Sequence, residues 1–175
     1  MEPTLKLEHH PISFFDRTKY YLLLYVGFLS FAGLFQLING QSRYFWVFLV
    51  VFTLCAGFYL VPKVYRARYF LLDFYADSNR VWMTYLHYSQ EHKLECSLDA
   101  LKIELRDISS RFNFNCELIL EIEGKKFYLN NDFDWGKADL KKLLDYLGFH
   151  TDLQLSVEEK ATLERFEQQL KKTPF

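Results

Sequence analysis

A long segment with almost no charge, close to the N-terminus, limits what this chain of 175 residues can fold into. Residues 20–62 comprise 43 residues and carry one formal charge, at Arg43. Soluble domains spread charged side chains over their surface, so a charge-free segment of this length is not expected in a soluble domain of this size. A segment that lies in lipid does require this composition. We therefore expect residues 20–62 to lie in a membrane.

A polar cluster divides this segment in two. Residues 39–43 read Asn-Gly-Gln-Ser-Arg, a sequence that favours a turn. The apolar runs on either side, residues 20–38 and 44–61, are each close to the roughly 20 residues that cross a hydrocarbon core as a helix. A helix also satisfies its backbone hydrogen bonds internally, as lipid requires. The sequence therefore predicts a multi-pass transmembrane hairpin over residues 20–62.

A secretory signal peptide is the alternative interpretation of the first run. Against it, the polar leader of residues 1–19 is long and mixed in charge, and no small-x-small cleavage site follows Ile38. We expect the first helix to be retained in the protein. Residues 1–19 are then a leader that lies in the cytoplasm or on the membrane surface, where its apolar residues suit the interface.

Basic residues flank the outer ends of the two runs, whereas the connecting loop carries only Arg43. Lysine and arginine accumulate on the cytoplasmic side of membrane helices, so both termini are expected in the cytoplasm. The same side chains form a juxtamembrane collar that is suited to contact anionic lipid headgroups. The candidate headgroup contacts are Arg17, Lys19, Lys63, Arg66 and Arg68.

Small residues recur on both apolar runs. Such residues let two membrane helices approach closely, so they are candidates for the contact within the hairpin. They are Gly27, Ser30 and Gly33 on the first run, and Ala56 and Gly57 on the second. The alternative is that they are ordinary membrane-helix residues without a packing role.

Beyond residue 62 the chain has the charge density of a soluble domain, with 36 of its 43 Asp, Glu, Lys and Arg residues in the last 113 positions. Several segments there alternate apolar and polar residues with a period of two, which is typical of half-buried strands. A hairpin is expected through residues 77–80, and further strands over 101–106, 116–123 and 126–130, with a short strand around 94–98. Five to seven antiparallel strands are thus predicted within residues 63–150.

A helix is expected to cap these strands, because four leucines recur at helical spacing over residues 140–147 and Gly148 then stops the pattern. A second helix is expected in the tail, residues 151–175, where Ser156 and Glu159 have the spacing of a capping box. Its apolar stripe is narrow, so the tail is either solvated or a partner-binding helix. The candidate partner contacts are Val157, Ala161, Phe166 and Leu170.

The strand meander of residues 68–130, closed by the sequence DWGKADLKKLLDYLG, resembles a pleckstrin-homology-like (PH-like) domain. A two-helix hairpin followed by such a domain resembles small bacterial membrane proteins of the YcxB-like kind. The resemblance implies an α+β membrane protein of the bacterial inner membrane. It would have an N-terminal transmembrane helical hairpin, followed by a cytoplasmic PH-like antiparallel β-domain that is capped by a C-terminal helix.

The sequence contains no catalytic motif: no nucleophile elbow, no phosphate-binding glycine loop and no kinase-type set. His87, His92 and Cys96 lack a second pair of ligands with zinc spacing. The carboxylates of Glu117, Glu121 and Glu123 are expected to be solvated, and Trp135 to belong to the core or a helix cap. We expect no enzymatic activity, no cofactor and no metal. A net charge of −1 gives no electrostatic footprint for nucleic acid.

Two functions fit these predictions. In the first, a non-enzymatic membrane protein is anchored by its hairpin, and its β-domain mediates assembly with a protein partner or with itself, as scaffold or subunit of a larger membrane complex. In the second, the protein is a regulatory module whose basic collar senses anionic lipid headgroups. The positive-inside rule alone would produce the same collar. An unrecognised membrane enzyme is the third alternative.

Overall fold

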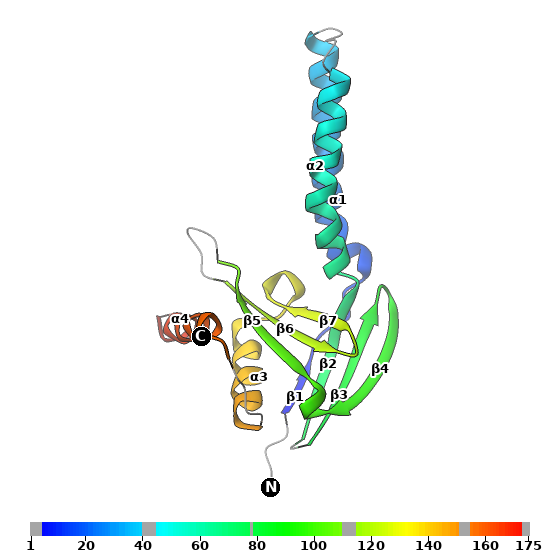
Figure 1. Ribbon diagram of the computed structural model, residues 1–175. Helices are drawn as coiled ribbons and strands as arrows, with labels where there is room; N and C mark the ends of the chain where they lie inside the picture. The colour runs from blue at the N-terminus through cyan, green and yellow to red at the C-terminus, as the bar shows by residue number, and fades with distance from the viewer. Residues whose placement is uncertain (1–4, 40–44, 78, 110–114, 151–154, 173–175) are drawn as a thin grey trace. The chain divides into compact units, whose positions relative to one another are not determined.

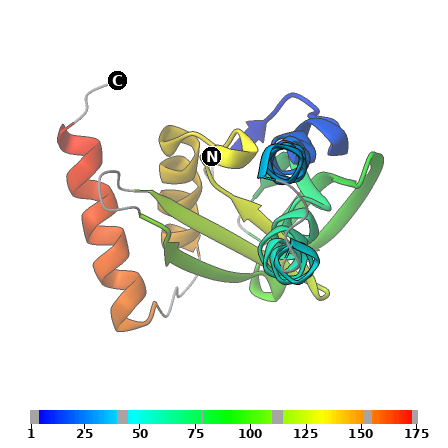
Figure 2. The same cartoon turned by 90° about the horizontal axis from the view of Figure 1, so that it is seen from above.

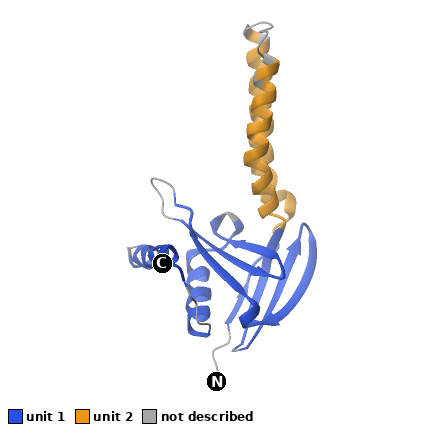
Figure 3. Cartoon of the chain, in the orientation of Figure 1, with its two compact units in different colours: residues 1–11, 69–175 blue, residues 12–68 orange. Residues whose placement is uncertain are grey.

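The computed structural model describes residues 5–39, 45–77, 79–109, 115–150 and 155–172 (Figure 1). Within these residues the chain forms four α-helices and seven strands in two antiparallel sheets, which confirms the expected α+β class. The chain divides into two compact units (Figure 3). Residues 1–11 together with 69–175 form unit 1, the β-domain, and residues 12–68 form unit 2.

The unit of residues 12–68 is a hairpin of two helices, α1 (Phe14–Asn39) and α2 (Phe45–Arg66). Ser13 caps α1, because its hydroxyl accepts a hydrogen bond from the Asp16 amide at 3.0 Å. The first helix therefore begins at Phe14 and not at residue 20. Each helix includes a window long and apolar enough to cross a membrane, Phe14–Gln36 in α1 and Leu49–Arg66 in α2. Large apolar side chains are exposed along both helices.

Contacts near the middle and near the ends hold the two helices together. The rings of Phe28 and Phe52 stack with their centroids 3.5 Å apart, and Ala32 is buried. Near the ends, the guanidinium of Arg17 donates a hydrogen bond to the backbone carbonyl of Ala67, which follows the last residue of α2. Carbonyls at the end of a helix lack a partner within the helix, so Arg17 acts as a cap for α2.

The β-domain contains a four-stranded sheet A, in the order β1-β2-β3-β4, and a three-stranded sheet B, in the order β5-β6-β7 (Figure 2). Sheet A consists of β1 (Leu5–Glu8), β2 (Tyr69–Ala76), β3 (Arg80–His87) and β4 (Gln90–Ser97). Sheet B consists of β5 (Lys102–Asp107), β6 (Cys116–Ile122) and β7 (Lys125–Leu129). Helices α3 (Lys137–His150) and α4 (Val157–Lys172) follow, and single 3₁₀ turns at Leu98–Ala100 and Asn131–Phe133 precede β5 and α3.

Strand β1 was not expected from the sequence. It pairs antiparallel with β2, with Leu5 opposite Ala76 and Glu8 opposite Asp73, and Leu7 is buried. The pairing continues past the strand, since the His9 amide donates to the Leu72 carbonyl at 2.8 Å. The predicted leader of residues 1–19 is therefore not one segment. Residues 5–8 belong to sheet A, and the α1–α2 hairpin is inserted in the chain between the first and second strands of that sheet.

The core of the β-domain is built from the inner faces of the two sheets and from α3. α4 adds one ring to this core. The largest fully buried side chains include Phe70, Phe74, Met83, Leu118, Leu120, Phe127, Trp135, Leu140 and, from α4, Phe166. Trp135 is a core residue, as the sequence indicated. Gly148 does not end α3, which continues to His150, because the helix tolerates one glycine in its last turn.

The β2–β3 turn forms where it was predicted, over residues 77–80. The Asp77 carboxylate accepts hydrogen bonds from the amides of Asn79 at 3.0 Å and Arg80 at 2.8 Å, and these bonds lower the pKa of Asp77. At the β6–β7 turn, Gly124 has a φ of +74°, in the left-handed region that glycine adopts without strain. Local side-chain and backbone chemistry therefore sets the register of both hairpins.

Candidate functional site

An aromatic pair lies on the outer face of sheet A. Tyr75 of β2 is the register partner of Trp82 of β3, and their ring centroids are 5.2 Å apart. The neighbours of Trp82 along the strand, Val81 and Met83, are buried in the core. Because side chains alternate across a strand, Trp82 points away from the core. Tyr75 is 38% exposed, so the pair presents aromatic surface to the outside.

A groove of about 540 Å³ runs past this pair across all four strands of sheet A. Charged side chains of both signs line it: Lys6 and Glu8 are 2.6 Å apart on β1, and Asp73 of β2 and Lys93 and Glu95 of β4 lie along its other strands. The groove therefore combines two aromatic rings with a charged rim. We refer to the groove and its Tyr75–Trp82 pair as the aromatic groove.

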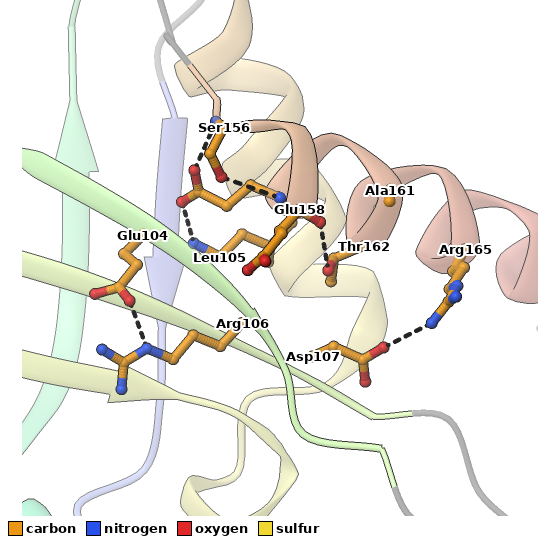
Figure 4. A pocket seen from close by; sticks show the side chains of 10 residues that line it. Glu104, Leu105, Arg106, Asp107, Ser156, Glu158, Ala161, Thr162 and Arg165 are labelled. Atoms are coloured by element: carbon orange, nitrogen blue, oxygen red, sulfur yellow. Dashed lines mark hydrogen bonds and ion pairs between the residues drawn. The ribbon is translucent and has the colours of Figure 1, made fainter.

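A second groove, of about 660 Å³, lies between β5 and α4 (Figure 4). The Glu159 carboxylate is its central contact. One oxygen accepts a hydrogen bond from the Leu105 amide of β5 at 3.0 Å, and the other accepts one from the Ser156 amide at 2.8 Å. The Ser156 hydroxyl in turn accepts from the Glu159 amide at 3.3 Å, which confirms the predicted capping box. Glu159 thus takes part in the N-terminal cap of α4 and attaches the helix to β5.

Two further contacts hold α4 on sheet B. Arg165 forms an ion pair with Asp107 at 3.2 Å, and Phe166 is only 1% exposed. Thr162, on the same face of the helix, is buried, and its hydroxyl donates to the Glu158 carbonyl at 2.9 Å. The face of α4 that contacts sheet B therefore contains Glu159, Thr162 and Phe166, three residues at helical spacing.

Hydrogen bonds also set the charge state of the carboxyl groups in this second groove. Burial raises the pKa of Glu159, but the amides of Ser156 and Leu105 lower it by more, so its pKa lies below the ordinary glutamate value. The side chain of Ser109 lowers the pKa of Asp107, with a contribution from Arg165. Both carboxyl groups are therefore stabilised in their charged forms by the contacts that attach α4.

The four residues proposed as a partner-binding stripe on the tail do not share one environment. Phe166 is buried in the β-domain, Leu170 is half-buried, Ala161 is exposed, and Val157 is 85% exposed. The four residues therefore do not form one exposed stripe, and partner binding by the tail stays a prediction. An apolar pattern could not reveal the contact face, because two of its members, Glu159 and Thr162, are polar.

The predicted collar residues have different environments at the base of the hairpin. Arg17 is 7% exposed and caps α2, whereas Lys19 is exposed and pairs with Asp16 at 2.7 Å. Lys63, Arg66 and Arg68 are half-buried. Two of these cations lie over aromatic rings: Lys63 is 6.0 Å from the Tyr21 centroid, and Arg68 is 3.6 Å from the Tyr65 centroid.

The small residues do not bring the helices close to each other. Gly27 and Ser30 are exposed, and Gly33, Ala56 and Gly57 are half-buried. No described atom of the other helix lies within 4 Å of the position that a Cβ would take at Gly27, Gly33 or Gly57. The stacked rings of Phe28 and Phe52 make the contact instead. The predicted role of these glycines within the hairpin is therefore not supported.

Glu117 departs from the sequence prediction. It is 2% exposed, and one of its carboxylate oxygens accepts a hydrogen bond from the Asn130 side chain at 2.7 Å. Strand β6 is the central strand of sheet B, and all of its residues except Glu121 are buried. The alternating pattern predicted a solvated face, but both faces of this strand are covered.

The histidines singled out in the sequence lie on β3 and β4. The ring centroids of His87 and His92 are 6.1 Å apart, and the two rings stack on Tyr69 and Tyr85 respectively. Cys96 lies farther along β4, opposite Val81. Among the described residues, no group of three His, Cys, Asp or Glu side chains is arranged to hold a metal ion.

In the comparisons with known proteins, no protein-family profile, curated protein or solved structure matches this chain.

Proposed function

We propose that this chain is a non-enzymatic integral protein of the bacterial inner membrane whose cytoplasmic β-domain assembles with a protein partner, as scaffold or subunit of a larger complex. The observation that carries this proposal is the aromatic groove on sheet A. Trp and Tyr are enriched at the energetic centres of protein interfaces, and charged residues at their rims. The Tyr75–Trp82 pair and the charged side chains around it have this arrangement.

The membrane anchor is supported by the length and the exposure of the helices. The two apolar windows, Phe14–Gln36 and Leu49–Arg66, suit the thickness of a hydrocarbon core. The pairing of β1 with β2 supports the orientation, because one strand precedes the hairpin and the other follows it. Both ends of the hairpin must then lie on the same side of the membrane. The basic residues at those ends favour the cytoplasmic side.

A PH-like fold is part of the proposal. Antiparallel sheets of four and three strands followed by a helix support it. In this interpretation the first strand is β1 and the capping helix is α3, so the membrane hairpin is an insertion after the first strand. A shared fold does not identify a ligand, and the assembly role therefore rests on the aromatic groove.

The assembly role can be tested on the full-length protein purified in mild detergent. We expect a particle larger than a monomer with its detergent, and we expect the double variant Tyr75→Ala/Trp82→Ala to lose the additional mass. Phe149→Ala is the matched control, since Phe149 is an exposed aromatic residue of α3 outside the groove. A monomeric parent without bound protein would refute the proposal, as would a double variant that keeps the parent's mass.

A second candidate function is the sensing of anionic lipid by the basic collar. It is favoured by the positions of Lys63 and Arg68 over the rings of Tyr21 and Tyr65, an aromatic and cationic combination suited to the headgroup layer. Arg17 is left out, because it caps α2. In lipid nanodiscs, anionic lipid should raise the melting temperature of the full chain in a salt-dependent manner. Lys63→Gln/Arg66→Gln/Arg68→Gln should lose that increase, and an increase unaffected by salt would exclude this function.

A further inference from the structure

Strand β5 forms an edge of sheet B, and its outward backbone groups can be identified. The Ile108 amide just beyond the strand donates to Asn115 on the β6 side at 3.0 Å, whereas the Leu105 amide donates to Glu159 of α4. Backbone groups alternate in direction along an antiparallel strand. Residues 103, 105 and 107 therefore direct their N–H and C=O groups away from β6, toward the edge that α4 covers.

Helix α4 covers this edge with side chains, which cannot reproduce a strand ladder. A carboxylate oxygen of Glu159 takes the position in which a neighbouring strand would place a carbonyl oxygen. Further contacts that attach the helix include the ion pair of Arg165 with Asp107 and the buried side chains of Thr162 and Phe166. An uncovered edge strand is a template for pairing with another chain, and natural proteins often cover such edges.

We propose that β5 is a dimerisation strand, and that a second copy of this chain pairs its own β5 antiparallel to it when α4 moves away. The sequence Lys102–Asp107, KIELRD, is self-complementary in this arrangement. A two-fold axis at Leu105 places Leu105 opposite Leu105, in the position where both residues direct N–H and C=O groups at each other. It also places Glu104 opposite Arg106 twice, which gives two cross-strand pairs of opposite charge.

Other registers are disfavoured by charge. Moving the axis by one residue places either Glu104 opposite Glu104, with Lys102 opposite Arg106, or Arg106 opposite Arg106. Like charges directly opposite each other destabilise a strand pair. Within one chain, Glu104 and Arg106 already form an ion pair at 2.5 Å on the exposed side of β5 (Figure 4), so both side chains are positioned to exchange partners. An axis at Ile103 would also oppose unlike charges, Lys102 and Glu104, but it pairs only three strand residues of each chain, whereas an axis at Leu105 pairs five. The register centred on Leu105 is therefore favoured by the extent of pairing and by charge together.

Strand β5 belongs to sheet B and the aromatic groove lies on sheet A, so pairing through β5 does not depend on the groove. The test uses the full-length chain in detergent with two substitutions that release α4, Glu159→Ala and Phe166→Asp. The first removes the acceptor for Leu105, and the second places a charge in the buried contact. We expect the particle mass to double relative to the unmodified chain, at a protein concentration high enough for pairing. Hydrogen exchange at the Leu105 amide should be fast after dilution and slow again in the doubled particle.

Charge reversal provides the matched controls. Arg106→Glu, added to the release variant, places Glu104 opposite a new carboxylate and should abolish the doubling. Glu104→Arg/Arg106→Glu in the same background restores opposite charges and should restore it. Lys141→Glu, an equal charge change on α3, should have no effect.

A second release variant, Thr162→Asp/Arg165→Glu, guards against misfolding of the first. The proposal is overturned if both release variants keep the mass of the unmodified chain. It is also overturned if the doubling is insensitive to the charges at positions 104 and 106. Neither result would affect the assembly proposal, because Tyr75 and Trp82 are unchanged in these variants. Conversely, Tyr75→Ala/Trp82→Ala in a release background should leave the doubling through β5 intact.

Discussion

Single polar residues make several of the contacts that define this molecule. Glu159 helps to cap α4 and accepts a hydrogen bond from the Leu105 amide of β5. Arg17 caps α2, and Glu117 forms a buried hydrogen bond with Asn130. In each case a polar group satisfies a donor or acceptor that solvent cannot reach freely. Loss of such a partner costs more than loss of an exposed hydrogen bond, because the remaining group loses its compensation for desolvation.

Substitution of Glu117 tests whether a buried hydrogen bond contributes more to stability than an exposed contact. Glu117→Ala removes the acceptor of a buried hydrogen bond and should lower the free energy of unfolding by about 1–3 kcal/mol. Glu117→Gln keeps an acceptor oxygen and should lower it less. Glu121→Ala is the control, because Glu121 lies on the same strand face but is only half-buried and forms an ion pair with half-buried Lys126. The measurement is denaturant unfolding, followed by the circular dichroism signal of the β-strands. Equal losses for Glu117→Ala and Glu121→Ala would contradict the assignment.

The charge of Glu159 makes the attachment of α4 sensitive to acid. Its pKa is lowered in the folded chain, so the attachment is fully stabilised above the ordinary glutamate pKa of about 4.3. The stabilisation is lost as the pH falls through the lowered value. The protection of the Leu105 amide against hydrogen exchange should therefore decrease in this range. In Glu159→Gln this pH-dependent step should be missing, and an unchanged step would assign the effect to another group.

Among the elements, the apolar helices and most of the strands could be predicted from the sequence. The charge-free segment predicted α1 and α2, and the alternation of apolar and polar residues predicted β5, β6 and β7. Strand β1 could not be predicted, because four residues give too short an alternation and their partner follows the hairpin. The contact between α4 and β5 was also hidden, since it depends on a backbone amide and the side chain of Glu159. The aromatic groove required the register that places Tyr75 beside Trp82.

The role of β1 as a strand of sheet A can be tested through Leu7. Leu7→Ala removes a buried side chain and should lower the free energy of unfolding of the β-domain by about 2–3 kcal/mol, near the lower end for core leucines because β1 is an edge strand. Lys6→Ala, on the opposite face of the strand, should change it by less than about 0.5 kcal/mol. If Leu7→Ala has no effect, residues 5–8 are not part of the sheet in solution.

The cap between Arg17 and Ala67 gives a second test at the scale of elements. Arg17→Ala removes a charged donor from the end of α2 and should reduce the stability of the hairpin by about 1–3 kcal/mol. Lys19→Ala is the matched control, since Lys19 is exposed and makes only a surface ion pair. Thermal unfolding of both variants in the same detergent compares them. A decrease of equal size in the two variants would show that Arg17 is not a cap.

At the scale of the whole molecule, the chain order explains how the helical hairpin and the β-domain are combined. The α1–α2 hairpin is inserted between β1 and β2, which pair with each other, so two chain connections join the units. If the hairpin spans a membrane as proposed, this order requires an even number of membrane crossings. Residues 5–11 and the segment from residue 69 onward therefore belong on one side of the membrane in the proposed arrangement.

Labelling of single cysteines from outside the cell tests this central claim most directly. In a chain with Cys55, Cys96 and Cys116 replaced by alanine or serine, Gln41→Cys places a thiol between the helices, and Glu91→Cys places one on exposed β4. A membrane-impermeant maleimide is added to bacterial cells whose outer membrane is permeabilised and whose inner membrane is intact. It should label the Gln41→Cys protein and not the Glu91→Cys protein. The latter should react only once the inner membrane is opened. Labelling of the Glu91→Cys protein in cells with an intact inner membrane would contradict the account, as would recovery of the full-length chain from the soluble fraction.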